Sequence, residues 1–358
     1  MINKINKKFF ERVQSAKFIS TRFKKYWPGA QKIISLKTEV VKIFLDYVRF
    51  TLRYRILVKM KTGRVLEKKV ILKAERPKKF SWPPRIGRVE RDFLATRFLE
   101  KRGLGSILPR PLEFYKPLRA YLYEEAAGET LKDFVQNKNW RSGRFFKNIP
   151  AAIRALKKIH AIKIRPAYAD GNHKKVILDG IRGWLEIISK YYPAGRDRAK
   201  TIVKTLEEIE KKYRGLLFDR KKYSVTHGDF QNDNIIIGPK GKVNFIDFAD
   251  SKFFNPFDDL ASFLVQAELH FKYERPKTYR QLTEKLRKIT YAAYFGKKIN
   301  PQDELQIDFF AAKDVLRIIT FVSFTQRTWQ AIHDHSKMMD ALLTFAEEKV
   351  KNLKNKAL

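Results

Sequence analysis

Four polar residues that could do chemistry, His227, Asp229, Asn234 and Asp247, lie among apolar residues between positions 227 and 247. The runs "IIIG" and "VNFID" read as short strands joined by the turn "PKGK", which would bring Asn234, at the start of one, near Asp247, at the end of the other. An amide oxygen and a carboxylate suit Mg²⁺, which then takes substrate phosphates as further ligands. Asp229, a short loop away, could accept a proton from a hydroxyl group.

The spacing H-x-D-x(4)-N followed by I-D-F resembles the catalytic loop and metal-binding Asp of kinases. The form "HGDFQNDNIII…NFIDFAD…NPFDDLA" is similar to the aminoglycoside phosphotransferase and choline kinase superfamily. Protein kinases usually read H-R-D and D-F-G here, where this chain has Gly228 and Ala249. The resemblance implies an α+β, protein-kinase-like bilobal fold. Its N-lobe would be small and β-rich with one main helix, and its larger, mostly helical C-lobe would carry the catalytic β-hairpin.

The resemblance also implies roles for the polar residues. Asp229 and Asn234 would be catalytic, with Asp229 as the base or the carboxylate that orients the hydroxyl. Asn234 and Asp247 would hold Mg²⁺ and so bridge the phosphates of ATP. His227 would brace the loop, and Asp259 of "DDLA" would tie the loop down through hydrogen bonds.

Three neighbouring residues receive a structural interpretation. We expect Asp250 to be an exposed loop carboxylate, with a second metal ion as the alternative. Asp258 reads as a solvated neighbour of Asp259 or as a helix N-cap. His160, in "ALKKIHAI", reads as a packing or capping residue.

A kinase also needs a Lys on the phosphates and a carboxylate that orients it. Lys73 ends the apolar run "KKVILK", and Glu90 follows in "RVERDFLATRFLEK", where the family has a similar V-E-R-E helix start. We therefore expect a Lys73–Glu90 pair, with Glu100 as the fallback partner. "AYLYEEAAGETL" resembles the linker between lobes, where backbone groups of Glu124 and Ala126 would bind adenine.

One departure from the family concerns the loop over the phosphates. Family members often have Gly between the first two strands, but "FLDYVRFTLRYRI" contains none, and Gly63 comes one hairpin later. Side chains such as Arg53 or Tyr47 would then grip ATP, or nucleotide affinity would be weak.

The order of elements agrees with two lobes. Strand-like runs are expected at 39–45, 51–60 and 64–75, with a hairpin turn at 61–64, a helix at 88–103 and short strands at 108–115 and 119–131. Helical patterns follow at 131–137, 144–162, 176–192 and 199–217, and again from Phe257 onward. We divide the chain into a basic amphipathic N-terminal segment (1–37), an N-lobe (38–127) and a C-lobe (128–358).

Composition limits the partners. The formal net charge is +38, there is no Cys, and no apolar run is long enough to cross a membrane. No signal peptide is evident, so a cytoplasmic location fits best. In the basic segment 1–37, Ile5, Phe9, Val13, Phe18 and Phe23 are spaced roughly as one side of a helix. The segment reads either as a helix packed on the protein or as one lying on an anionic membrane, at the inner face.

The leading hypothesis is an ATP- and Mg²⁺-dependent phosphotransferase acting on a hydroxyl of a small molecule, such as a sugar, an amino alcohol or a polyol. A polycationic aminoglycoside fits poorly, because its pocket would have to be strongly acidic. One alternative is a membrane-surface kinase of a lipid headgroup or lipid-linked glycan. The other is a non-catalytic module that binds polyanions or nucleic acid without sequence specificity.

Overall fold

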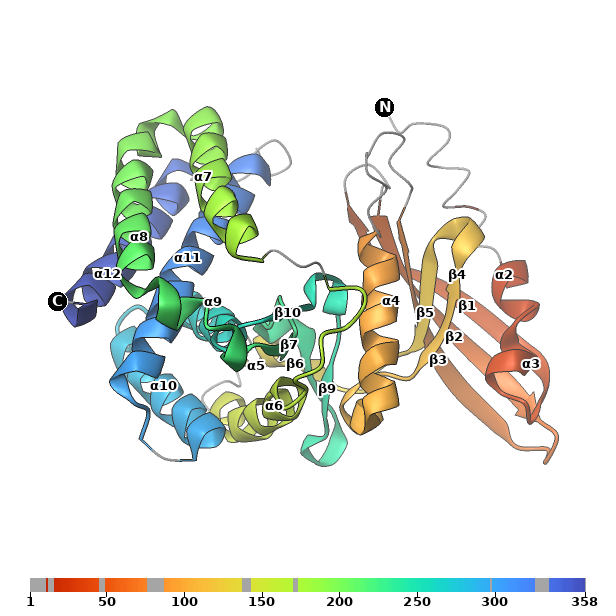
Figure 1. Cartoon of the computed structure of the whole chain (residues 1–358). Coiled ribbons are helices and arrows are strands. Elements are labelled where there is room, and N and C mark those ends of the chain that lie inside the picture. Colours follow the sequence, from red (N-terminus) through yellow and green to blue (C-terminus); the bar gives the residue numbers. More distant parts are fainter. Residues whose placement is uncertain are drawn as a thin grey trace. The chain divides into compact units, whose positions relative to one another are not determined.

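The computed structural model describes residue 11 and the ranges 16–44, 49–75, 87–136, 143–169, 173–296, 298–325 and 335–357 (Figure 1). The chain divides into two compact units. The first unit comprises 1–128 and 236–251, and the second comprises 129–235 and 252–358. The division after 128 falls one residue from the expected one, but the hairpin segment 236–251, expected in the C-lobe, groups with the first unit.

The first unit contains a five-stranded antiparallel sheet with the order β1-β2-β3-β5-β4. Its strands are β1 (Ala30–Phe44), β2 (Arg49–Met60), β3 (Val65–Glu75), β4 (Pro111–Tyr115) and β5 (Ala120–Glu124). The predicted turn between β2 and β3 is confirmed. Met60 N–H donates to Arg64 O at 2.8 Å, and Gly63 supplies the positive φ of +80° that such a turn needs.

The two faces of this sheet are covered by different helices (Figure 1). In β3, Val70, Leu72 and Ala74 belong to one core cluster, whereas Ile71 packs on the other face with Val89 of α4 (Arg88–Leu99). Side chains alternate along a strand, so Lys73 shares the face of Ile71. The sheet therefore directs Lys73 toward α4.

The opposite face is covered by the N-terminal segment, which corrects the expected boundary at residue 37. The helices α2 (Ala16–Ser20) and α3 (Phe23–Tyr26) bring Phe18, Ile19 and Phe23 into the core of the sheet, and β1 already begins at Ala30. Residues 16–37 are thus part of the first unit and not a separate segment, which agrees with the expectation of a helix packed on the protein. The expected apolar positions Ile5, Phe9 and Val13 lie outside the described residues.

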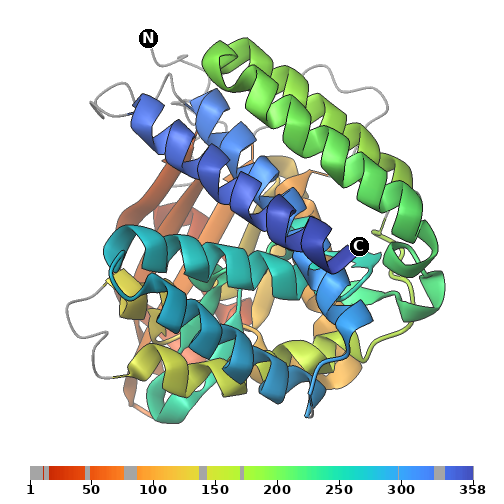
Figure 2. The same ribbon diagram turned by 90° about the vertical axis from the view of Figure 1, so that its left-hand side faces the viewer.

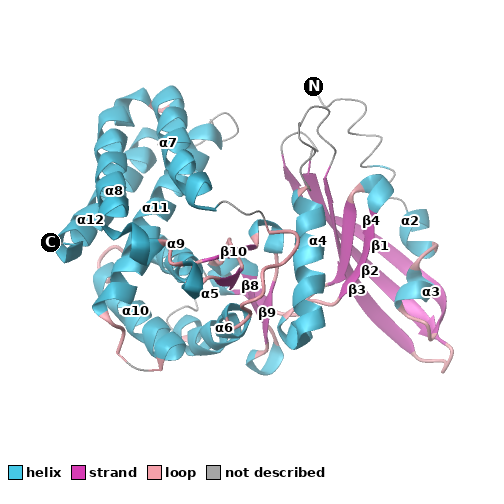
Figure 3. Ribbon diagram, in the orientation of Figure 1, coloured by secondary structure: helices cyan, strands magenta, loops and turns pink. Residues whose placement is uncertain are grey.

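The second unit is mostly helical, as predicted (Figure 3). Its helices are α5 (Leu131–Gln136), α6 (Arg144–His160), α7 (His173–Tyr191), α8 (Arg196–Leu217), α9 (Phe257–Glu274), α10 (Tyr279–Phe295), α11 (Pro301–Thr325) and α12 (His335–Ala357). Figure 2 shows α7, α8, α11 and α12 packed side by side. Within the described ranges, no helix is long and apolar enough to span a membrane.

Short strands frame the polar residues of interest. β7 (Ser224–Thr226) pairs with β10 (Lys252–Phe254), β8 (Ile235–Ile237) and β9 (Val243–Phe245) form the predicted hairpin, and β6 is Glu129–Thr130. A π-helical turn at Glu100–Leu104 follows α4. Short 3₁₀ turns lie at Gly105–Ile107, Lys116–Leu118, Pro193–Gly195, Arg220–Lys222, Asn232–Asn234, Pro239–Gly241 and Phe248–Asp250.

Candidate active site

Lys73 is the centre of a buried charge cluster in the first unit. Its Nζ donates to Asp92 Oδ2 at 2.7 Å and lies 3.1 Å from Asp247 Oδ1. The Asp92 side chain is only 3% exposed, and its Oδ1 accepts a hydrogen bond from Phe248 N–H at 2.8 Å. Asp92 therefore connects Lys73 of the sheet with the residue that follows Asp247.

The expected Lys73–Glu90 pair is wrong, because Asp92 takes that place. Val89, Asp92 and Leu99 are buried on the sheet side of α4. At about 100° per residue, Glu90 lies roughly 200° around the helix from Asp92, which directs it away from the sheet. The fallback partner is wrong as well, since Glu100 pairs with Arg97 at 2.6 Å.

These neighbours keep Lys73 charged. Burial alone would lower the pKa of its ammonium group, but Asp247 and Asp92 raise that pKa well above its usual range. A permanently charged Lys beside a carboxylate that is 39% exposed, Asp247, is suited to bind a phosphate that approaches from solvent.

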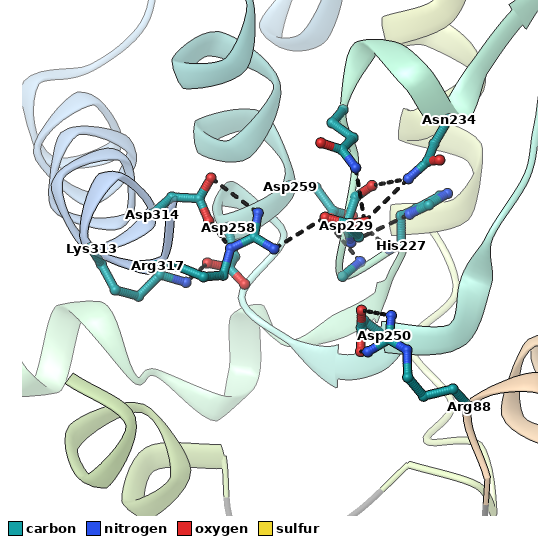
Figure 4. A network of polar contacts seen from close by, with 12 residues as sticks. Arg88, His227, Asp229, Asn234, Asp250, Asp258, Asp259, Lys313, Asp314 and Arg317 are labelled. Atoms are coloured by element: carbon teal, nitrogen blue, oxygen red, sulfur yellow. Dashed lines mark hydrogen bonds and ion pairs between the residues drawn. The ribbon is translucent and has the colours of Figure 1, made fainter. Parts of the chain in front are cut away.

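Asp247 has a left-handed backbone conformation, with a φ of +68°. Residues other than glycine seldom adopt this conformation, and those that do are often found at functional sites. Nearby, both oxygens of Asp250 accept hydrogen bonds from Arg88 Nη1 and Nη2, at 2.7 and 2.6 Å (Figure 4). The Asp250 side chain is 35% exposed, in line with the expected loop carboxylate, but it is paired with Arg88.

Asp229 lies on the loop after β7 in the second unit, and nitrogen donors contact both of its carboxylate oxygens (Figure 4). Its Oδ2 accepts from Gln231 Nε2 at 3.0 Å and from Asn234 Nδ2 at 3.3 Å. Its Oδ1 accepts from Arg317 Nη1 at 3.2 Å. The side chain remains 14% exposed, so the carboxylate is oriented and still within reach of a small molecule.

Asn234 is turned so that its amide nitrogen binds within the loop. Besides its contact with Asp229 Oδ2, Nδ2 donates to the backbone oxygen of Asp229 at 2.8 Å. The amide oxygen is then the atom that could coordinate a cation, which is the donor type that Mg²⁺ prefers.

Asp259, on the first turn of α9, holds the loop as the sequence predicts. Its carboxylate accepts from the backbone N–H groups of His227 at 2.7 Å and Gly228 at 2.8 Å. His160 completes this brace, with Nε2 lying 2.9 Å from Asp259 Oδ2 and Nδ1 lying 2.8 Å from the hydroxyl of Tyr294. His160 therefore supports the loop that carries Asp229, through Asp259, in addition to packing.

The expectation of a solvated or helix-capping Asp258 is wrong, because its side chain is buried and Pro256 is the N-cap of α9. Its carboxylate is buried, accepts from Lys252 Nζ at 2.6 Å and forms a second ion pair with Lys313 (Figure 4). Burial alone would raise the pKa of Asp258, but the two ammonium groups lower it below its usual range. Asp258 thus joins β10 and α9 to α11 through a buried charge network.

Four further residues were expected to contact the nucleotide, and the structure describes three of them. The backbone N–H of Glu124 donates to Arg110 O, and its carboxylate accepts from Trp27 Nε1 and Arg110, so these two groups already have partners within the first unit. Ala126 lies in the partly exposed loop after β5. Arg53 pairs with Glu39 and Glu125 in place of reaching a ligand, and Tyr47 lies outside the described residues.

Sequence reasoning missed several residues of these clusters. Gln231 lies within the motif and could have been chosen as a partner of Asp229 from its position alone. The contacts of Asp92, His160 and Arg317 come from α4, α6 and α11, far along the chain, and no local pattern marks them.

Comparison with known proteins identifies the family and the fold of this chain. The model of the phosphotransferase enzyme family matches residues 62–295. The choline kinase LicA from Streptococcus pneumoniae superposes with a TM-score of 0.60 at 13% identity, covering 94% of this chain and 98% of that one. A search of curated proteins finds no match.

Two further solved structures were determined with nucleotides. A spectinomycin phosphotransferase in complex with ADP and spectinomycin has a TM-score of 0.56 at 12% identity, covering 96% of this chain and 99% of that one. An amicoumacin kinase in complex with AMP-PNP and Ca²⁺ has a TM-score of 0.59 at 15% identity, covering 96% of each chain. The expected α+β, kinase-like fold is confirmed.

Proposed function

Because this chain belongs to the phosphotransferase enzyme family, we propose that it transfers the γ-phosphate of ATP to a hydroxyl group of a small molecule with the help of Mg²⁺. The observation that carries the proposal is the family match over 62–295, which contains both Lys73 and the loop with Asp229. The surroundings of these two residues support it, since Lys73 is oriented by the buried Asp92, Asp229 is oriented by Gln231 and Asn234, and both side chains remain partly exposed.

Asp229 would serve the acceptor. Its carboxylate takes the hydroxyl proton while the acceptor oxygen bonds to the γ-phosphorus and the bond from that phosphorus to the β,γ-bridging oxygen breaks. The electron pair of the broken bond stays on the departing ADP. Gln231 and Asn234 hold Asp229 in one orientation, which is the positioning that phosphoryl transfer chiefly requires.

Lys73 would serve the nucleotide by neutralising its phosphates, with Asp92 fixing the ammonium group. Asn234 and Asp247 would hold Mg²⁺, and their oxygens are the donor type that this ion takes. When bound, Mg²⁺ would neutralise the charge that develops on the β- and γ-phosphate oxygens. Glu124 and Ala126 remain the proposed adenine contacts, and His227 and Asp259 the support of the loop.

The alternatives receive less support. A membrane-surface kinase would need an apolar helix face to enter the bilayer, but Phe18 and Phe23, the expected apolar positions that the structure describes, are buried in the sheet core. A non-catalytic polyanion-binding module would have no need of a carboxylate oriented by two amides, such as Asp229.

A thermal-shift titration with ATP and Mg²⁺ tests the nucleotide site. The wild-type protein should gain stability from MgATP, by about 2.7 kcal/mol at 100 times the dissociation constant. Asp247→Ala should lose the Mg²⁺-dependent part of this gain. Asp229→Asn should keep it and lose transfer of phosphate from ATP.

Polyphosphate is the necessary control, because a protein with a net charge of +38 binds many polyanions. A stabilisation that polyphosphate reproduces, or that Asp247→Ala leaves unchanged, would contradict the proposed metal and nucleotide site. Normal phosphate transfer by Asp229→Asn would contradict the role of Asp229.

A further inference from the structure

A charged pair on α11 contacts Asp229 although nothing in the motif marks it (Figure 4). Arg317 Nη1 donates to Asp229 Oδ1 at 3.2 Å. Asp314 lies three positions before Arg317 on the same helix, and its Oδ1 accepts from Arg317 Nε at 2.6 Å while its Oδ2 accepts from Nη2 at 3.3 Å. The guanidinium thus lies between two carboxylates of this chain and connects α11 with the loop after β7.

The hydrogen-bond donors of Asp229 divide between its two oxygens. Gln231 Nε2 and Asn234 Nδ2 both donate to Oδ2, at 3.0 and 3.3 Å. These two donors belong to the same loop as Asp229, and they hold one oxygen. A carboxylate that is held at one oxygen can still turn, because the torsion about its Cβ–Cγ bond has a broad energy minimum. Its plane is fixed when the second oxygen is held as well.

Arg317 holds the second oxygen from outside the loop. Its partner Asp314 is only 5% exposed, so the guanidinium is attached to a buried carboxylate. A planar guanidinium bound along one edge has a fixed direction for its other donors, and it stays charged at every pH that the protein meets. Arg317 therefore ties Oδ1 of Asp229 to a defined place beside α11.

We propose that Arg317, held by Asp314, is a positioning residue that fixes the plane of the Asp229 carboxylate and so orients it toward the hydroxyl of the acceptor. The proposal rests on the proposed function, because Asp229 must be the residue that receives the hydroxyl proton. That proton moves to Asp229 while the acceptor oxygen bonds to the γ-phosphorus and ADP leaves with the electron pair of the broken bond. Arg317 acts on this step only through Asp229.

The expected effect of losing Arg317 follows from the sensitivity of the transfer to position. A misplacement of about 1 Å can lower the rate about 100-fold. A carboxylate that turns about one oxygen moves the other oxygen by a distance of this order. Arg317→Met should therefore lower kcat by about 10- to 100-fold. The KM for MgATP should change little, because the proposed phosphate and metal contacts Lys73 and Asp247 belong to the other unit.

The kinetic test uses the full chain with water as the acceptor, so that no choice of acceptor enters the result. Release of inorganic phosphate from MgATP gives kcat and KM for the wild type, Arg317→Met, Arg317→Lys, Asp314→Asn and the double variant with Asp314→Asn and Arg317→Met. Arg280→Met is the control, since it removes the same charge from an exposed position on α10. Thermal unfolding shows whether each variant is folded.

The variants should differ in kcat in a fixed order. Arg317→Lys should lower kcat less than Arg317→Met, because an ammonium group keeps the charge but lacks the planar fork that binds two carboxylates at once. Asp314→Asn should also lower kcat, but it should have no further effect in an Arg317→Met background, because Asp314 acts through Arg317. Millimolar guanidinium should restore part of the kcat of Arg317→Ala. A merely structural role of Arg317 would show neither the non-additivity nor the rescue.

Crystal structures of the wild type and Arg317→Met give a second readout that needs no turnover. In the variant, the Asp229 carboxylate should turn or occupy more than one orientation. The backbone of the loop should stay in place, because Asp259 still accepts from the N–H groups of His227 and Gly228. If wild-type release of phosphate is too slow to measure, these structures decide the question.

Three outcomes would overturn the proposal while leaving the proposed function intact. They are an Asp229 carboxylate oriented in Arg317→Met as in the wild type, a kcat that Arg317→Met leaves unchanged, and an equal effect of Asp314→Asn with and without Arg317. The proposed function fails on different evidence, namely a wild type that MgATP does not stabilise or normal phosphate transfer by Asp229→Asn. In that case this inference fails with it.

Discussion

Replacing Asp92 by Asn should destabilise the protein far more than replacing Glu90 by Gln, although sequence reasoning favours Glu90 as the partner of Lys73. Asp92 is 3% exposed and binds both Lys73 Nζ and Phe248 N–H, whereas Glu90 lies on the other side of α4. The two substitutions remove the same charge from positions two residues apart on one helix. They therefore form a matched pair that differs only in the direction of the side chain.

The expected loss of stability depends on which partners each substitution leaves unpaired. Removing one member of a buried ion pair costs about 3–5 kcal/mol. Asp92→Asn keeps an acceptor for Phe248 N–H, and Lys73 keeps Asp247 at 3.1 Å, so we expect about 2–3 kcal/mol. Asp247 offsets only part of the loss, because it is exposed enough for solvent to screen it. For Glu90→Gln we expect less than about 0.5 kcal/mol.

Urea unfolding followed by tryptophan fluorescence measures the difference, since Trp27 is buried in the core of the first unit. With a slope of about 2–3 kcal/mol per molar urea, Asp92→Asn should move the midpoint down by roughly 1 M. The Glu90→Gln midpoint should stay within experimental error of the wild type. Equal shifts for both variants, or the larger shift for Glu90→Gln, would refute the placement of Asp92 beside Lys73.

Three further predictions concern the glycines and the two carboxylates at the start of α9. Gly128→Ala should lower the free energy of unfolding by more than about 2 kcal/mol, because the new Cβ would lie 2.3 Å from the backbone oxygen of Ile237 at a φ of +137°. Gly63→Ala is the control and should lower it by only about 1 kcal/mol, because there is open space around Gly63 at a φ of +80°. Thermal unfolding measures both, and equal losses of stability would contradict the close approach of Gly128 to Ile237. Asp259→Asn should lower kcat by about 10-fold or more with little change in MgATP affinity, because the backbone N–H groups of His227 and Gly228 lose their charged hydrogen-bond acceptor. Steady-state kinetics and an ADP titration measure the two quantities. An unchanged kcat would contradict the role of Asp259 in holding the loop. Asp258 has a lowered pKa in the folded state, so its contribution to the free energy of unfolding is present above its unfolded value of about 3.9 and lost as pH falls through the folded value. The urea midpoints of wild type and Asp258→Asn should therefore converge below about pH 4, and a constant difference down to about pH 2 would contradict the ion pairs.

Local spacing in the sequence is enough to predict the hairpin, the order of strands and helices, and the choice of Asp229, Asn234, Asp247 and Lys73 as candidates. These depend on short segments whose apolar flanks and turns are visible within about 20 residues. The orientation of adjacent acids is not visible in this way. "VERD" offers Glu90 and Asp92, and only packing decides that Asp92 turns inward; in "FDDL" both Asp258 and Asp259 are buried, each with different partners.

Contacts between residues far apart in the sequence could not be predicted from local patterns either. His160 meets Asp259 across 99 positions of the sequence, and Arg317 meets Asp229 across 88. No local periodicity encodes such pairs. The boundary at residue 37 was wrong for a related reason. A basic helix that packs on a sheet and one that lies on a membrane share the same pattern of apolar residues, so the pattern does not show whether the segment belongs to the first unit.

The hairpin segment 236–251 has a consequence for how the protein is made. Asp247 and Phe248, which complete the cluster around Lys73 and Asp92, reach the first unit only after more than a hundred further residues have been synthesised. At about 5–20 residues per second, the emerging chain waits roughly 5–20 s with this cluster incomplete. The first unit therefore cannot reach its final form before residues 129–235, half of the second unit, have been synthesised. In a fragment that ends at Gly128, the Asp92 carboxylate would lack its hydrogen bond from Phe248 N–H.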